Sequence, residues 1–119
     1  MARAAGAMTV RELVEDVRRE MLKGNITPDR GAQLDARLSA LLGNCFEEIR
    51  EADLEYNVVL LQMFKVHTKA NRAKIEAETT AEFVRRREAR DTHTLVLEMI
   101  HSLRHLGRVA SEEMRLQRG

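Results

Sequence analysis

The chain contains few of the residues that disulfide-rich proteins, membrane proteins and compact globular enzymes depend on. Its 119 residues include one cysteine, one proline and no tryptophan, and aromatic residues make up 3%. A single cysteine excludes an internal disulfide. Because Cys45 lies on an apolar stripe, we expect a buried, unreactive thiol in a reducing cytoplasm. No run of 18 apolar residues occurs, so we expect no membrane-spanning helix.

Catalytic and cofactor motifs are also missing. The six glycines are scattered and form no phosphate-binding loop. Ser39, Ser102 and Ser111 lie in no nucleophile motif, and Glu47 and Glu48 belong to an acidic run that resembles a solvated face. We therefore expect a protein that is not an enzyme, with no catalytic residues, no cofactor and no small-molecule substrate.

The histidines offer one pattern that is typical of metal proteins. Glu98 and His101 have the Glu-x-x-His spacing of di-iron bundles, and His105 follows four residues later. A metal needs three or four ligands that converge on one point. At about 100° per residue, His101 instead points away from the predicted packing side of its helix. We expect no metal site.

A long heptad pattern dominates the sequence. Charged residues make up 33%, and apolar residues recur at alternating steps of four and three over 38–77. The positions are Leu38, Leu42, Cys45, Ile49, Ala52, Tyr56, Val59, Met63, Val66, Ala70, Ala73 and Ala77. This pattern predicts an all-α protein with a long central helix and antiparallel helical arms, as in a coiled-coil-like hairpin or bundle.

A capping box marks the first predicted helix. The Thr9 hydroxyl can accept a hydrogen bond from the Glu12 amide, and the Glu12 side chain can return it. This helix covers 10–23 and ends at the Gly-Asn pair at 24–25, since both residues tolerate a positive φ. Residues 1–8 contain one arginine and no long apolar core, unlike a secretory signal, and we expect a frayed, disordered tail.

The central helix is predicted over 28–78. Thr27 is its cap, and Pro28 suits its first position because that position needs no N–H donor. Gly43 and Asn44 could bend or stop it, but the heptad phase continues through them, which favours one helix.

The third predicted helix covers 80–117 and follows a second capping box at 79–82, with Thr79 as the cap. The tight turn makes it antiparallel to the second half of the central helix, and the first helix should fold back on the first half. In this register His67 lies opposite His93, a pair that could sense pH. We treat 1–119 as a single helical domain.

A second apolar stripe lies beside the main seam and makes 54–64 apolar almost all round. One partner helix cannot cover so much apolar surface. The stripe is either a second internal packing contact or a subunit interface, most simply that of a two-fold dimer with a four-helix core. The predicted interface residues are Phe46, Leu54, Val58, Leu60, Leu61 and Phe64.

Charge is balanced overall, at +1, but uneven locally. The stretch 65–90 has eight basic and four acidic residues, whereas 47–55 is net −4. The basic tip of the predicted hairpin could contact phosphates and stack an aromatic ring on a base, or it could be an ordinary solvated face of Arg–Glu pairs. The candidate contacts with nucleic acid or a protein partner are Lys65, Lys69, Arg72, Lys74, Phe83, Arg85, Arg86, Arg87 and Arg90.

Four segments, ANRAKIEA at 70–77, ETTAEF at 78–83, EARD at 88–91 and EMIHSLR at 98–104, resemble small all-helical proteins of tailed phages and prophages. The resemblance covers about 49–115. It implies a phage-type origin, the cytoplasm of a bacterial host, and action by binding to phage DNA during recombination or replication, or to a host factor. The resemblance assigns no functional residue.

These observations favour a non-enzymatic binding or scaffold protein that acts through helix faces on a protein partner and self-associates as a homodimer or higher oligomer. The alternative is a nucleic-acid-binding accessory protein that uses the basic tip.

Overall fold

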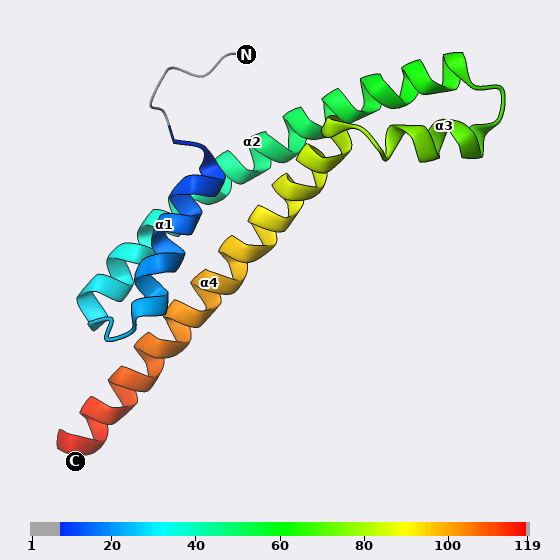
Figure 1. Cartoon of the computed structure of the whole chain (residues 1–119). Helices are drawn as coiled ribbons and strands as arrows, with labels where there is room; N and C mark the ends of the chain where they lie inside the picture. The colour runs from blue at the N-terminus through cyan, green and yellow to red at the C-terminus, as the bar shows by residue number, and fades with distance from the viewer. Residues whose placement is uncertain (1–7, 119) are drawn as a thin grey trace. The chain divides into compact units, whose positions relative to one another are not determined.

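A computed structural model describes residues 8–118, where the chain forms helices and no strand. Of the expected tail at 1–8, residues 1–7 lie outside the described residues. The prediction of an all-α fold is confirmed (Figure 1). The chain divides into two compact units, one built from 8–43 and 94–118 and the other from Asn44–His93. The helices are α1 (Val10–Lys23), α2 (Pro28–Val66), α3 (Ala70–Ala77) and α4 (Ala81–Arg118).

The ends of α1 and the start of α2 follow the capping signals. The Thr9 hydroxyl accepts a hydrogen bond from the Glu12 amide at 3.0 Å. Gly24 and Asn25 both have a positive φ, 77° and 56°, and end the helix. Thr27 caps α2 by accepting a backbone amide hydrogen bond at 3.1 Å. The predicted bounds of the first helix and the start of the central helix are therefore confirmed.

The first unit contains α1, 28–43 of α2 and 94–118 of α4. Two ion pairs join its helices: Arg30 Nη2 donates to Glu20 Oε1 at 2.7 Å, and Arg104 Nε donates to Asp35 Oδ2 at 3.0 Å. Large aliphatic side chains fill the centre of the unit. The buried residues are Val14, Val17, Leu34, Leu38, Leu41, Val96, Met99, Ile100 and Leu103.

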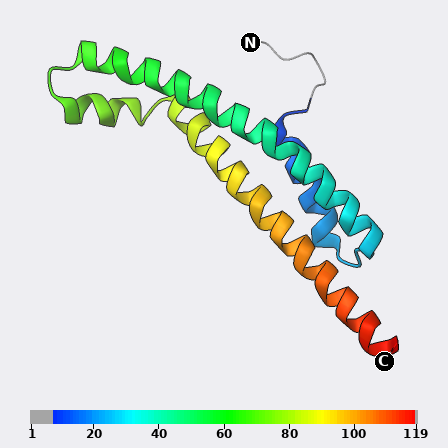
Figure 2. The ribbon, with the colours of Figure 1, turned by 180° about the vertical axis from the view of Figure 1, so that it is seen from behind.

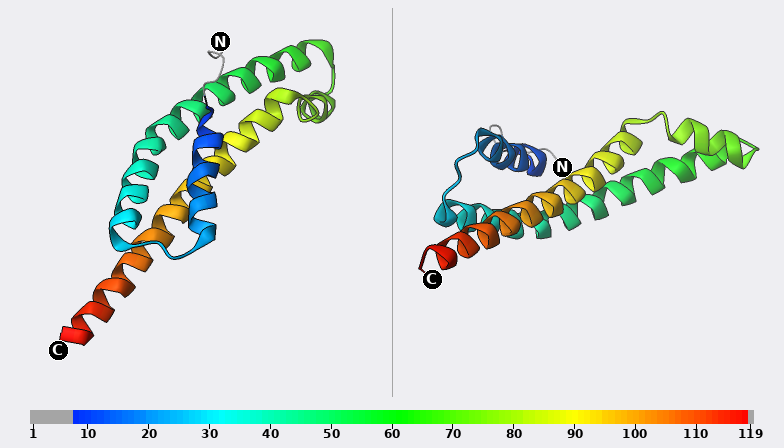
Figure 3. Two further views of the ribbon diagram at one scale, coloured as in Figure 1. Left: turned by 60° about the vertical axis from the view of Figure 1, so that its left-hand side comes forward. Right: turned by 90° about the horizontal axis from the view of Figure 1, so that it is seen from below.

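The second unit contains 44–66 of α2, α3 and 81–93 of α4. In Figures 1, 2 and 3, α3 lies against the last turns of α2. Small residues dominate the core, which lets the helices approach closely. Burial raises the pKa of the Cys45 thiol, so the expected inert thiol is confirmed as buried. The buried residues are Cys45, Ala52, Tyr56, Ala73, Ala77, Ala89 and Thr92.

The predicted central helix over 28–78 is wrong at its C-terminal end, because α2 stops at Val66. Three residues at 67–69 leave the helix, and α3 then folds back on the same unit. The heptad pattern did not reveal this break because Ala73 and Ala77 keep the seam spacing and are buried on the separate helix α3. Histidine and threonine at 67–68 are weak helix formers and give the helix little reason to continue.

Because the chain reverses at 67–69, earlier than predicted, the alignment of α4 along α2 differs from the predicted one. The α4 cap is Thr80, whose hydroxyl accepts from the Phe83 amide at 3.3 Å, and not Thr79 as predicted. The ring centroids of Phe46 and His93 lie 4.8 Å apart. The predicted register, which placed His67 opposite His93, is therefore wrong. It assumed that the central helix continued to residue 78, more than three turns beyond Val66.

Gly43 and Gly107 lie inside α2 and α4, and substituting them tests whether each helix is regular at that position. An added Cβ would meet nothing within 4 Å at Gly43 or at Gly107. Because alanine restricts the unfolded chain and favours helix, Gly43→Ala and Gly107→Ala should each raise the free energy of unfolding by about 0.5–1 kcal/mol.

The matched control is Gly24→Ala, which forces a side chain onto a residue with φ 77° and should lower the stability by about 1 kcal/mol. Urea unfolding followed by circular dichroism measures all three variants. A loss of stability in Gly43→Ala would contradict a regular helix at that position.

Candidate interaction surfaces

An apolar stripe on α2 of the second unit is exposed to solvent. Leu54, Val58 and Leu61 are 61%, 56% and 62% exposed, and their spacing of four and three puts them on one side of the helix. At about 100° per residue, this side lies roughly opposite the buried Ala52 and Tyr56. This part of α2 therefore has two apolar faces, and the fold of the unit covers one of them.

The other predicted interface residues lie beside this stripe. Phe46 and Phe64 are exposed but lie about 80° around the helix from Leu54, and Phe46 also contacts the ring of His93. Leu60 is half-buried, closer to the core side. Of the six predicted residues, three form a continuous line, Phe46 and Phe64 flank it, and Leu60 lies towards the core.

The stripe ends in charges of opposite sign. Glu47 lies two turns before Leu54, and Lys65 lies one turn after Leu61, on the same side of the helix. Both side chains are exposed. Glu47 pairs with Arg50 of its own helix at 3.0 Å, an exposed pair of small energetic weight. This side of α2 therefore has a negative charge at its N-terminal end, at Glu47, and a positive charge at its C-terminal end, at Lys65. The apolar side chains of Leu54, Val58 and Leu61 lie between the two charges.

The acidic run on α2 faces the arginines of α4 inside the second unit. Arg85 contacts the carboxylates of Glu48 and Glu51, both at 3.4 Å, and also pairs with Glu55. Arg86, the next residue of α4, and Arg90, one turn further on, reach Asp53 at 3.0 and 3.1 Å. The two regions of opposite charge are therefore paired with each other, and much of the predicted positive tip is neutralised within the unit.

Aromatic contacts accompany these ion pairs. The Arg86 guanidinium lies 4.8 Å from the centroid of the Tyr56 ring, a cation–π geometry. The Phe83 ring packs 5.7 Å from Tyr56, tilted by 53°. Phe83 is half-buried in this contact. The ring that was predicted to stack on a base thus packs against α2.

The ion pairs shift the pKa values of the carboxyls that receive them. Burial alone would raise the pKa of Asp53, but hydrogen bonds from Arg90 and Arg86 and their positive charges outweigh it, so this pKa lies below its ordinary value of 3.8. The Arg85 hydrogen bond lowers the pKa of Glu55 below 4.5, and the same bond raises the pKa of Arg85. The charged form of each group is thus favoured in the folded unit.

The remaining predicted cations lie on the surface of the second unit. Arg72 pairs with Glu76, one turn away on α3, at 3.2 Å. The exposed basic side chains of the predicted set that lie outside the arginine pairs with α2 are Lys65, Lys69, Arg72, Lys74 and Arg87.

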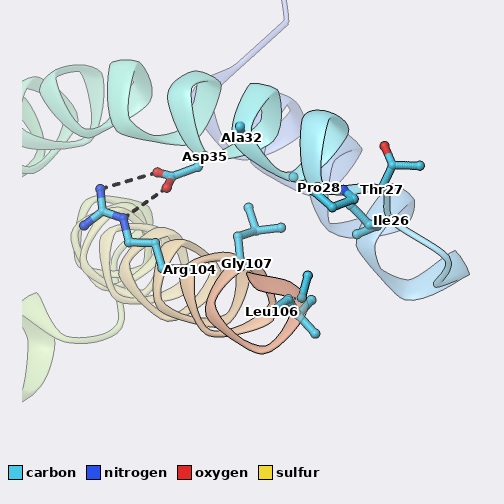
Figure 4. Close-up of a pocket in the computed structure, with 11 residues that line it drawn as sticks. Ile26, Thr27, Pro28, Ala32, Asp35, Arg104, Leu106 and Gly107 are labelled. Carbon is cyan, nitrogen blue, oxygen red and sulfur yellow. Dashed lines mark hydrogen bonds and ion pairs between the residues drawn. The ribbon is translucent and has the colours of Figure 1, made fainter. Parts of the chain in front are cut away.

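The first unit has a small apolar pocket of about 170 Å³ between the start of α2 and α4 (Figure 4). Gly31 and Gly107 line it, and the Asp35–Arg104 ion pair lies at its edge. Pockets that enclose drug-sized ligands measure about 300–1,000 Å³. The pocket is smaller than this range. We interpret it as a gap in packing, because small residues line it.

Residues 8–118 contain neither a cluster of metal ligands nor a helix suited to a membrane. No group of three or more His, Cys, Asp or Glu side chains there could hold a metal ion. Within the same residues, no helix combines the length and apolar character needed to cross a bilayer.

Comparisons with known proteins identify no family. No family model, no curated protein and no solved structure matches the chain.

Asp53 is the carboxylate that both Arg86 and Arg90 share, so its contribution should depend on pH. Because its pKa is lowered in the folded state, the stabilisation is fully present above its ordinary pKa of 3.8 and is lost as the pH falls through the folded value. Asp53→Asn should lower the free energy of unfolding by about 1 kcal/mol at neutral pH and by almost nothing at about pH 2.

The control is Asp91→Asn, which removes an exposed carboxyl of α4 and should leave the stability within about 0.5 kcal/mol of wild type at both pH values. Thermal unfolding by circular dichroism compares the three proteins. An equal loss for Asp53→Asn at both pH values would mean that the carboxylate charge carries none of the effect.

Proposed function

We propose that the chain is a non-enzymatic helical scaffold that self-associates and binds a protein partner through its exposed helix faces. One observation carries the proposal: the line of Leu54, Val58 and Leu61, each more than half exposed, on the side of α2 away from the core. Each such side chain gains about 1.5–3 kcal/mol when it is fully buried. Another helix face that covers the line would supply that burial.

The chemistry of the described residues supports a binding role. In the second unit Arg86 and Arg90 of α4 pair with Asp53 of α2, and the apolar pocket of the first unit is a small packing gap. The resemblance to small phage and prophage proteins, which often act by binding, agrees with this proposal. A phage-type scaffold would act in the cytoplasm of a bacterial host.

Binding to nucleic acid is the weaker interpretation. A phosphate site needs uncompensated cations, and Arg85, Arg86 and Arg90 each contact a carboxylate of α2. The exposed lysines remain available for weak, salt-sensitive contacts with a polyanion.

The exposed line gives a direct test of self-association. The double variant Leu54→Glu/Leu61→Glu should be a helical monomer, because it places charges where an apolar contact is proposed and leaves the core residues in place. Wild type should form dimers or larger species as its concentration rises. Analytical ultracentrifugation measures the mass, and circular dichroism measures the helicity.

The matched control is Val84→Glu, an exposed apolar residue on α4, which should associate as wild type does. A wild-type protein that stays monomeric at every concentration would refute self-association. A double variant that remains a dimer would exclude this face.

The arginine pairs also predict weak binding to nucleic acid. At physiological salt, single- and double-stranded fluorescent oligonucleotides should show no change in anisotropy with the wild-type protein, because Arg85, Arg86 and Arg90 are already paired with carboxylates of α2. Any binding at low salt should be lost in Lys65→Ala/Lys69→Ala/Lys74→Ala. Tight binding that survives physiological salt would instead favour the nucleic-acid interpretation.

A further inference from the structure

The exposed line on α2 has a charge pattern that selects its partner. Its apolar centre, Leu54 to Leu61, is flanked by Glu47 on the N-terminal side and Lys65 on the C-terminal side, all on one side of the helix. The steps from Glu47 through Glu51, Leu54, Val58 and Leu61 to Lys65 alternate four and three residues. This is the spacing of a coiled-coil seam.

We infer that the occupant of this face is a second copy of the chain, with the two α2 helices packed antiparallel about a two-fold axis midway between Leu54 and Val58. This inference rests on the self-association proposed above and adds the partner and its direction. In this register Leu54 packs on Val58 of the partner copy, and Glu47 lies opposite Lys65 of the partner copy. By symmetry each contact occurs twice.

Charge complementarity selects the antiparallel arrangement. A parallel pair in register would place Glu47 against Glu47 of the second copy, and Lys65 against Lys65, at opposite ends of the contact. Like charges across a helix pair are destabilising, whereas opposite charges stabilise it. The antiparallel pair converts both repulsive contacts into attractive ones without moving the apolar centre.

Part of the acidic run is paired within its own copy. Glu51 lies on the seam, opposite Leu61 of the partner copy in this register, and its carboxylate contacts Arg85 of its own α4 at 3.4 Å. Glu48 and Asp53 are half-buried and paired with arginines of α4 in the same copy. Glu47 pairs with Arg50 of its own helix in an exposed contact, and its side chain is 61% exposed. Its carboxylate therefore lies on the side that a second copy would approach.

Charge reversal tests the direction of packing. Glu47→Lys and Lys65→Glu should each weaken the dimer, raising its dissociation constant about tenfold, and the double variant should return it close to the wild-type value. The control Arg87→Glu, at an exposed position of α4, should leave it unchanged. Sedimentation equilibrium gives the constants, and circular dichroism checks that each variant keeps its helicity.

Each outcome decides between the proposals. If wild type dimerises but the single reversals leave the constant unchanged, or the double variant does not recover, the antiparallel arrangement is wrong while self-association stands. If wild type is monomeric at every concentration, both proposals fall.

Crosslinking gives an independent readout that does not depend on affinity. In a Cys45→Ala background, which removes the natural buried thiol, Glu47→Cys and Lys65→Cys are treated with a short bismaleimide, separately and as a mixture. The antiparallel dimer predicts covalent dimers in the mixture and few in either protein alone. Efficient crosslinking of either protein alone would overturn it.

Discussion

Asp53 on α2 accepts hydrogen bonds from two arginines of α4, and the second unit depends on this contact for its register. Alanines dominate the buried residues where its helices meet. Alanine surfaces are small and alike, so sliding one helix along another would change their contacts little. Shifting α4 by one heptad would separate Asp53 from Arg86 and Arg90, and Tyr56 from Phe83. Apolar burial alone therefore hardly distinguishes one alignment of α2 and α4 from another. The polar and aromatic pairs select the alignment that the unit adopts.

This pairing also determines which surface remains for function. It directs the arginines of α4 and most of the acidic run of α2 towards each other, so they offer little net charge to a distant partner. The exposed line at Leu54, Val58 and Leu61 lies on the side of the same helix away from the buried Ala52 and Tyr56. A helix that uses one face for its own unit and presents the other to solvent is suited to joining chains. This division of faces is the physical basis for the proposed scaffold function.

Much of the fold could be predicted from local signals. The caps at Thr9 and Thr27 specify their helix starts through single hydrogen bonds between neighbouring residues, and such bonds do not depend on tertiary structure. The seam correctly identified Leu38, Cys45 and Tyr56 as buried. The break after Val66 could not be predicted, because a chain reversal depends on packing between α3 and α2 and leaves the apolar spacing unchanged.

The error at that break explains the errors at the candidate site. A turn placed at 79–80 puts Arg85 and Arg86 close to the end of a hairpin. There their side chains would be exposed to solvent and could bind phosphate. The reversal at 67–69 brings them alongside the acidic run. The apolar stripe was less sensitive to this error, because its exposure depends on the side of α2 that it occupies and not on where α2 ends.

The alignment of α2 with α4 can be measured directly through the single tyrosine of the chain. A nuclear Overhauser spectrum of the labelled protein should show cross-peaks between the ring protons of Tyr56 and those of Phe83, whose rings are 5.7 Å apart. That result would establish the register on which the paired arginines and the exposed face both depend. Cross-peaks from Tyr56 to Leu103 in place of Phe83 would restore the turn at 79–80 and contradict the account.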